Sequence, residues 1–145
     1  MVSKHEAFWG HPSYAVVGHT ARARYPLLTY RALKDRGKRV VPIDPEADTI
    51  EGDKALHSLA ELGEPVDGLV IEVPREETRS WVEQAAAAGI KRVWIHMNRD
   101  TPEALSLARE KGIEVCTGTC AVQYLTTGFS PHAIHRTIRK ILGRY

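Results

Sequence analysis

A polar loop that follows a short apolar segment is the strongest candidate for chemistry in this sequence. Residues 14–18 are apolar and end in Gly18, and the loop beyond them carries Arg22 and Arg24 before Pro26 opens a helical pattern. Backbone N–H groups and the helix dipole at such a junction attract anions, and an arginine can bind two phosphate oxygens at once. A glycine also lets the backbone approach a pyrophosphate closely. We therefore expect a phosphate-binding loop formed by Gly18, His19, Thr20, Arg22, Arg24, Tyr25 and Pro26.

The alternative for this loop is a solvated connection with two ordinary surface arginines. Residues 18–23 hold only the first of the three glycines of the dinucleotide fingerprint. The sequence also lacks a GxxxxGK[ST] pattern, so it does not support ATP hydrolysis of the P-loop kind. Asp44 follows a second apolar segment and has two interpretations: it accepts a hydrogen bond from a ribose hydroxyl, as in NAD-binding folds, or it is a turn residue before Pro45.

Two cysteines and several histidines raise the question of a metal site. Cys116 and Cys120 are four residues apart, a marginal spacing for zinc, whose remaining ligands would come from His96, His132 and His135. Two separate thiols are the alternative that we favour, and a reactive or ligand-facing Cys120 is a third. We therefore predict no metal ligands.

Two histidines, His19 and His96, fall where apolar segments end, and either could titrate near neutral pH or bind phosphate. We favour histidines at the rim of a pocket without a role in proton transfer. No set of acid, base and nucleophile can be assembled from the sequence. We therefore predict no catalytic residues, and we expect a binding protein rather than a self-sufficient enzyme.

The elements that position these residues alternate between strands and helices. Strands are predicted at residues 14–18, 39–43, 68–73, 92–95 and 113–116, and helices at 26–36, 76–88, 102–111 and 131–142. Short apolar strands that alternate with helices are typical of a parallel sheet covered on both faces. We therefore predict an α/β fold, a doubly wound, mainly parallel five-stranded sheet of Rossmann-like type, whose ligand binds in the loops 18–26, 44–50, 74–76 and 96–101.

The segments outside this alternation have less definite predictions. Residues 46–64 look irregular apart from a short helical piece near 56–62. Phe8 and Trp9 are expected in a short N-terminal helix on the sheet edge, whereas Trp81 and Trp94 are expected in the core.

Length and charge exclude several classes of protein. The 145 residues fit a single domain, 1–145, that can bury a core without disulfides or metal. Twenty Lys and Arg residues against eighteen Asp and Glu residues give a net charge of +2, which argues against broad binding of nucleic acid. No apolar run is long enough to span a membrane, and the first residues do not look like a signal peptide. With reduced thiols as the default, we expect a cytoplasmic protein.

Several short segments, in this order and spacing, resemble a known family. The sequence is similar to the small stand-alone CoA-binding proteins, the YccU-like CoA-binding domain family, which resemble the CoA-binding domain of succinyl-CoA synthetase alpha chains. The similarity spans roughly residues 14–125 and rests on residues 15–18, 41–45, 50–52, 65–67, 93–95 and Cys120.

The resemblance implies a ligand and a set of contact residues. CoA or an acyl-CoA would bind with its pyrophosphate on the Gly18 loop. The adenosine part would be flanked by Asp44, Pro45, Val73, Pro74 and Arg75. His96 would stand where the family usually has Gln, and Asn98 of the same loop completes the predicted cofactor-binding residues.

The sequence also departs from the family pattern. His19 and Thr20 replace the usual Ala-Ser, and Asp44 replaces Asn. These changes keep NAD(P) or another adenine nucleotide open as the ligand. A homodimer or a partner enzyme is a further possibility, with Tyr124, Leu125, Phe129 and Tyr145 as the expected contact residues.

Overall fold

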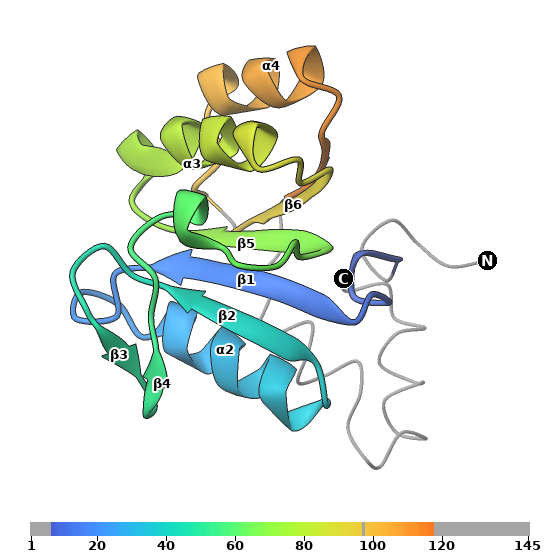
Figure 1. Ribbon diagram of the computed structural model, residues 1–145. Helices are drawn as coiled ribbons and strands as arrows, with labels where there is room; N and C mark the ends of the chain where they lie inside the picture. Colours follow the sequence, from blue (N-terminus) through green and yellow to red (C-terminus); the bar gives the residue numbers. More distant parts are fainter. Residues whose placement is uncertain (1–6, 97, 118–145) are drawn as a thin grey trace, which may run out of the picture.

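The computed structural model describes residues 7–96 and 98–117 of the chain. Its main sheet has five strands in the order β2-β1-β5-β6-β7, and all four pairings are parallel (Figure 1). The strands are β1 (Ser13–Gly18), β2 (Arg39–Ile43), β5 (Gly68–Glu72), β6 (Arg92–Ile95) and β7 (Glu114–Cys116). The predicted parallel sheet and its five strands are therefore confirmed, with ends that differ by one residue at most.

Helices cover both faces of this sheet, as predicted. Helix α2 (Tyr25–Asp35) lies on one face, and α3 (Arg75–Ala87) and α4 (Pro102–Glu110) lie together on the other (Figure 1). The Thr101 side chain accepts a hydrogen bond from the Ala104 N–H at 3.1 Å, which fixes the start of α4. The predicted helix at 131–142 lies outside the described residues. In the described part of the chain, no helix combines the length and apolar character needed to cross a membrane.

The alternation of side chains along the strands sorts the core into two layers. Val17, Ile71 and Ile95 pack with α3 and α4, where the predicted core residue Trp81 also lies. On the opposite face, residues such as Val70 and Trp94 form a second buried cluster. The core prediction for both tryptophans is confirmed.

The prediction that Phe8 and Trp9 pack at the sheet edge is wrong. The Trp9 ring lies 4.7 Å from the Trp94 ring of β6, and Phe8 lies 5.4 Å from Tyr14 of β1. Both β6 and β1 are inner strands. The two aromatic side chains therefore cover a face of the sheet, where they bury more apolar surface than an edge offers.

The segment expected to be irregular contains a small hairpin. Strands β3 (Thr49–Ile50) and β4 (Asp53–Lys54) pair antiparallel, and a short 3-10 helix, η1 (Leu59–Glu61), follows them. Glu51 and Gly52 in the turn have φ values of 52° and 84°, which tight hairpin turns require. Ile50 of this hairpin is buried beside Tyr30 of α2, so the hairpin is attached to the helix that follows β1.

Strand order reverses between β1 and β5, and this defines the ligand crevice. From β1 the chain moves outward to β2 and then returns to place β5 on the other side of β1. The loops that leave β1 and β5 therefore diverge, and doubly wound folds bind ligands in this gap. Its walls are the Gly18 loop and the residues from Val73 to the first turn of α3.

The absence of a side chain at Gly18 lets the helix approach the strand. A Cβ built there would lie 2.1 Å from Pro26 Cγ and 2.9 Å from the Glu72 carbonyl oxygen. Pro26 is in the first turn of α2, so Gly18 sets the distance between β1 and its helix. The glycine was expected to make room for a pyrophosphate, and the structure shows that packing within the fold already requires it.

Replacing Gly18 with alanine should therefore destabilise the fold itself. We expect Gly18→Ala to lower the free energy of unfolding by about 1–3 kcal/mol, because the new methyl group overlaps Pro26. Gly63→Ala is the matched control, since no described atom lies within 4 Å of a Cβ at that position. Urea unfolding of both variants measures the difference. Equal stability of Gly18→Ala and the wild type would contradict the packing argument.

Candidate functional site

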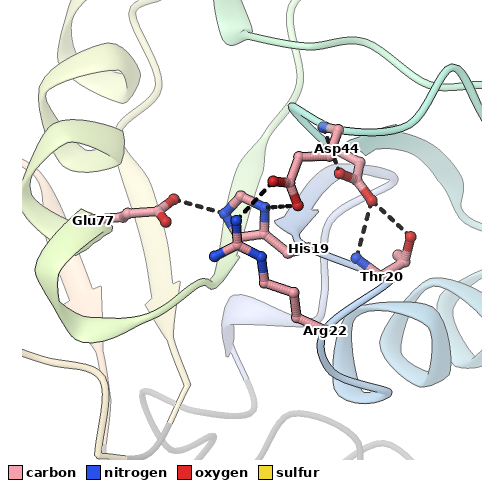
Figure 2. A network of polar contacts seen from close by, with 6 residues as sticks. His19, Thr20, Arg22, Asp44 and Glu77 are labelled. Carbon is pink, nitrogen blue, oxygen red and sulfur yellow. Dashed lines mark hydrogen bonds and ion pairs between the residues drawn. The ribbon is translucent and has the colours of Figure 1, made fainter.

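The carboxylate of Asp44 holds the Gly18 loop in place. Asp44 lies directly after β2 and is 1% exposed. Its Oδ2 accepts hydrogen bonds from the Thr20 N–H at 2.9 Å and the Thr20 hydroxyl at 2.6 Å, and its Oδ1 accepts one from the Glu46 N–H at 2.8 Å (Figure 2). Burial alone would raise the pKa of Asp44, but these hydrogen bonds outweigh it and lower the pKa below its usual value. Asp44 is thus an ionised anchor between two loops.

The imidazole of His19 joins the two walls of the crevice. His19 Nδ1 lies 3.1 Å from Glu46 Oε1, and Nε2 lies 2.8 Å from Glu77 Oε1 in the first turn of α3 (Figure 2). A neutral imidazole can donate a hydrogen bond to only one carboxylate, whereas a protonated one can donate to both. His19 is 6% exposed, so this contact closes the floor of the crevice.

Arg22, expected to bind phosphate, pairs with an acidic side chain instead. Its Nη2 donates to Glu46 Oε2 at 2.7 Å, and this bond holds the pKa of Glu46 below its usual value. The backbone of the loop is also partly used, because the N–H groups of Arg22 and Ala23 donate to the His19 carbonyl oxygen. Sequence analysis missed Glu46 and Glu77, and no local pattern marks either of them.

A small cavity opens between the two walls. Its volume is about 180 Å³, and its lining residues are His19, Arg22, Ala23, Glu72, Val73, Pro74 and Arg99. The structure thus brings His19, Arg22, Val73 and Pro74 together as predicted, and adds Arg99 from the loop after β6. Ligand pockets usually measure about 300–1,000 Å³, so this cavity has room for a phosphate group and not for a whole nucleotide cofactor.

The other predicted residues are not among those that line this cavity. Arg24 and Pro45 are exposed, and Asn98 is exposed with a φ of 66°. Arg75 donates to the Asp100 carbonyl oxygen at 2.9 Å, which connects the start of α3 to the loop after β6. Tyr25 is 44% exposed at the start of α2.

A buried carboxylate and a buried histidine lie side by side at the ends of β5 and β6. Glu72 Oε2 lies 3.4 Å from His96 Nδ1, within reach of an ion pair but longer than a good hydrogen bond. Glu72 Oε2 also accepts a hydrogen bond from the Thr29 hydroxyl of α2 at 2.8 Å. The Tyr25 ring lies 4.7 Å from the His96 ring. Burial raises the pKa of Glu72, and the contacts with His96 and Thr29 offset this only in part.

Three side chains of the site have the composition of a metal centre. Ligand atoms of His19, Asp44 and Glu46 all lie within 4.8 Å of one another. Their oxygen and nitrogen atoms already bind Thr20, Arg22, Glu77 and each other, so an ion would have to replace these contacts. Of the zinc ligands weighed from the sequence, Cys116 is buried at the end of β7 and His96 faces Glu72, while Cys120, His132 and His135 lie outside the described residues.

A larger cavity lies away from this crevice. Its volume is about 630 Å³, and it is lined mainly by apolar residues of η1, the segment before β5 and the last turn of α3, among them Leu59, Leu62, Pro65 and Ala87. Helix α3 runs antiparallel to the strands, so this cavity lies near their amino ends. It lacks the cationic side chains that a phosphate needs among its described lining residues.

The raised pKa of Glu72 predicts how stability depends on pH. The folded state binds this proton more tightly than the unfolded chain, so the stabilisation is fully present below the unfolded pKa of about 4.5 and is lost as pH rises through the folded pKa. Glu72→Gln avoids this loss. We expect the variant to be more stable than the wild type at neutral pH. The difference should shrink as the pH falls toward about 4.5.

Urea unfolding of both proteins, between about pH 4.5 and neutral pH, measures how the difference in stability changes. Glu83→Gln, at an exposed position of α3, is the control and should leave the pH dependence unchanged. A Glu72→Gln protein that loses stability equally at every pH would show that ionised Glu72 is well compensated.

Comparison with known proteins agrees with this architecture. Residues 12–143 match the family described as a CoA binding domain. The chain is 28% identical over 107 residues to the uncharacterized protein YneT of Bacillus subtilis, covering 73% of this chain and 79% of YneT. A conserved hypothetical protein of Pyrococcus furiosus has a similar structure, with a TM-score of 0.70, 29% identity, and coverage of 77% of this chain and 97% of that one.

A much longer protein contains the same fold as one part. The dinucleotide forming acetyl-coenzyme A synthetase 1 of Ca. Korarchaeum cryptofilum matches with a TM-score of 0.62 and 24% identity, covering 72% of this chain and 25% of that one. This match shows the fold alone. The family match extends over most of the sequence and includes both walls of the crevice, and the chain therefore belongs to the CoA-binding domain family.

Proposed function

We propose that this protein binds coenzyme A or an acyl-CoA in the crevice between the β1 and β5 loops and acts as a binding protein rather than a self-sufficient enzyme. The observation that carries the proposal is the cavity of about 180 Å³ at the strand reversal, with Arg22, Arg99 and His19 in its lining. It has the size and the cationic side chains for a phosphate group of the cofactor, whose remaining parts would lie along the surface outside it.

The ion pair between Arg22 and Glu46 does not prevent such binding. The side chains are 55% and 43% exposed, and ion pairs that are this open to solvent contribute little to stability. A charge-assisted hydrogen bond to phosphate contributes roughly 1.5–3 kcal/mol. Arg22 can therefore replace its contact with Glu46 by one with a phosphate, while the Glu46 side chain rotates toward the solvent.

The contacts of Asp44 favour CoA over NAD(P) as the ligand. Acidic residues at the end of the second strand of NAD-binding folds bind a ribose hydroxyl. Here both carboxylate oxygens of Asp44 accept hydrogen bonds from Thr20 and the Glu46 N–H. Asp44 therefore serves the loop, and the sequence-based alternative of a turn-forming residue fits better than a contact to ribose.

A role beside a partner enzyme is compatible with this proposal. The fold occurs as about a quarter of a longer chain named as an acetyl-coenzyme A synthetase, where it is joined to other parts. In such a role, this fold would supply the cofactor-binding part. The residues expected to contact a partner, Tyr124, Leu125, Phe129 and Tyr145, lie outside the described residues.

Thermal melting with candidate ligands tests the proposal. CoA at one hundred times its Kd should stabilise the protein by about 2.7 kcal/mol and raise Tm by roughly 5–11 °C. We expect a smaller effect from NAD, NADP and ATP at the same concentration. A clear shift with NAD and none with CoA would replace the proposed ligand.

Variants of the two arginines locate the site. Arg22→Ala and Arg99→Ala should each weaken CoA binding by roughly ten- to a hundredfold, because each loses one charge-assisted hydrogen bond to phosphate. Arg109→Ala, in the last turn of α4, is the matched control and should leave the affinity unchanged. Titration calorimetry gives the three affinities. Equal affinities in all three variants would exclude this crevice as the binding site of CoA.

A further inference from the structure

The buried pair of Glu72 and His96 has a place in the site that the proposed contacts do not use. Glu72 contributes to the lining of the phosphate-sized cavity, and His96 lies behind it at the end of the neighbouring strand. Within the described part of the chain, Glu72 Oε1 and His96 Nδ1 have no hydrogen-bond partner of good geometry. Buried polar groups in folded proteins are nearly always paired, so these two atoms require an explanation.

The charge of Glu72 directly affects any anion in the cavity. The Glu72 side chain is 1% exposed, so its carboxylate is buried beside the cavity. An ionised carboxylate at this place repels a phosphate in the cavity, and low exposure to water strengthens the repulsion. A protonated Glu72 removes this repulsion and makes the net charge of the pair one unit more positive. The protonation state of the pair therefore sets the charge that an entering anion meets.

We propose that Glu72 and His96 form a proton-sharing pair that couples the binding of an anionic group in this cavity to the uptake of one proton from solvent. The inference rests on the proposed function only in placing an anion in this cavity.

The proton count of the pair is explicit. In the empty site one proton is shared, either as a carboxylate beside an imidazolium or as a carboxylic acid beside a neutral imidazole, and the pair has no net charge. When the anion binds, a second proton is added: it forms an O–H bond on Glu72 if the first proton is on His96, or an N–H bond on His96 if the first proton is on Glu72, and no other bond changes. The pair then carries one positive charge next to the anion.

Two structural features support this assignment. The Thr29 hydroxyl binds Glu72 Oε2 and leaves Oε1 as the oxygen that can carry the added proton. Burial already raises the pKa of Glu72, so the cost of protonating it is reduced before any ligand enters. Other titratable or charged groups around the pair and its cavity come from α2, the β1 and β6 loops, the loop after β2 and α3, namely Tyr25, His19, Arg22, Arg99, Glu46 and Glu77.

Calorimetric titration in buffers of different ionisation enthalpy measures the proton uptake. CoA and inorganic pyrophosphate are the two probes, each tested between about pH 6 and about pH 8. The proposal predicts uptake approaching one proton per ligand, with an affinity that falls by up to about tenfold for each unit of rising pH. Glu72→Gln, which imitates the protonated acid, should bind both probes more tightly than the wild type at about pH 8. It should also lose the proton uptake.

A second variant separates this pair from the other histidine of the cavity. His19→Gln should change the affinity but keep the proton uptake, because His19 belongs to a different set of carboxylates. Uptake that persists in Glu72→Gln would overturn the role of Glu72. Uptake that disappears in His19→Gln would overturn the proposal and assign the proton to His19.

The two probes distinguish failure of this inference from failure of the proposed function. If CoA binds without proton uptake, the function stands and the pair has no such role. Pyrophosphate binding with uptake, in the absence of CoA binding, would leave the pair as assigned and reject CoA as the ligand. If neither probe binds to the wild type or to Glu72→Gln, both proposals are wrong.

Discussion

The hydrogen bonds to the carboxylate of Asp44 are the interaction on which the site depends. They tie the loop after β1 to the loop after β2 through Thr20 and the Glu46 N–H. The position of Thr20 fixes the neighbouring His19, and the position of Glu46 sets the partner of both His19 and Arg22. Without this anchor, the Gly18 loop and the His19 contact that joins it to Glu77 of α3 would lose their fixed positions.

Most of the charged side chains of the crevice contact one another. His19 lies between Glu46 and Glu77, Arg22 pairs with Glu46, and Glu72 faces His96. A ligand phosphate that binds Arg22 must replace the contact between Arg22 and Glu46, so this part of the site exchanges one anionic partner for another. The exposed pair of Arg22 and Glu46 can be broken at a low cost in free energy. The buried pair of Glu72 and His96 instead changes its protonation when an anion binds, as we propose.

The sequence predicted the fold well because its signals are local. Each strand is a short apolar run that ends at a glycine or a proline or is followed by a polar loop, and Thr101 with Pro102 marks a helix start that the structure confirms. The hairpin at Thr49–Ile50 and Asp53–Lys54 was not predicted, because strands of two residues carry almost no periodicity. Phe8 was placed on the sheet edge because residue types alone do not say which surface an aromatic cluster covers.

The site was predicted only in part because its contacts join distant segments. Gly18, His19, Arg22 and Pro74 could be found from the ends of strands, where ligands bind in this fold. Glu46, Glu77 and Arg99 come from other loops and a helix, and their positions depend on tertiary packing that no local pattern encodes. For the same reason, the sequence did not reveal the packing role of Gly18, because its contact with Pro26 depends on α2 lying against β1.

Mapping of backbone amide signals during a titration with CoA tests the central claim most directly. If the crevice at the strand reversal is the binding site, the largest chemical-shift changes should fall on Thr20, Arg22, Ala23 and residues 75–77, which belong to its two walls. Changes centred instead on Leu59, Leu62 and Ala87, around the larger apolar cavity at the other end of α3, would contradict this account and move the ligand site there.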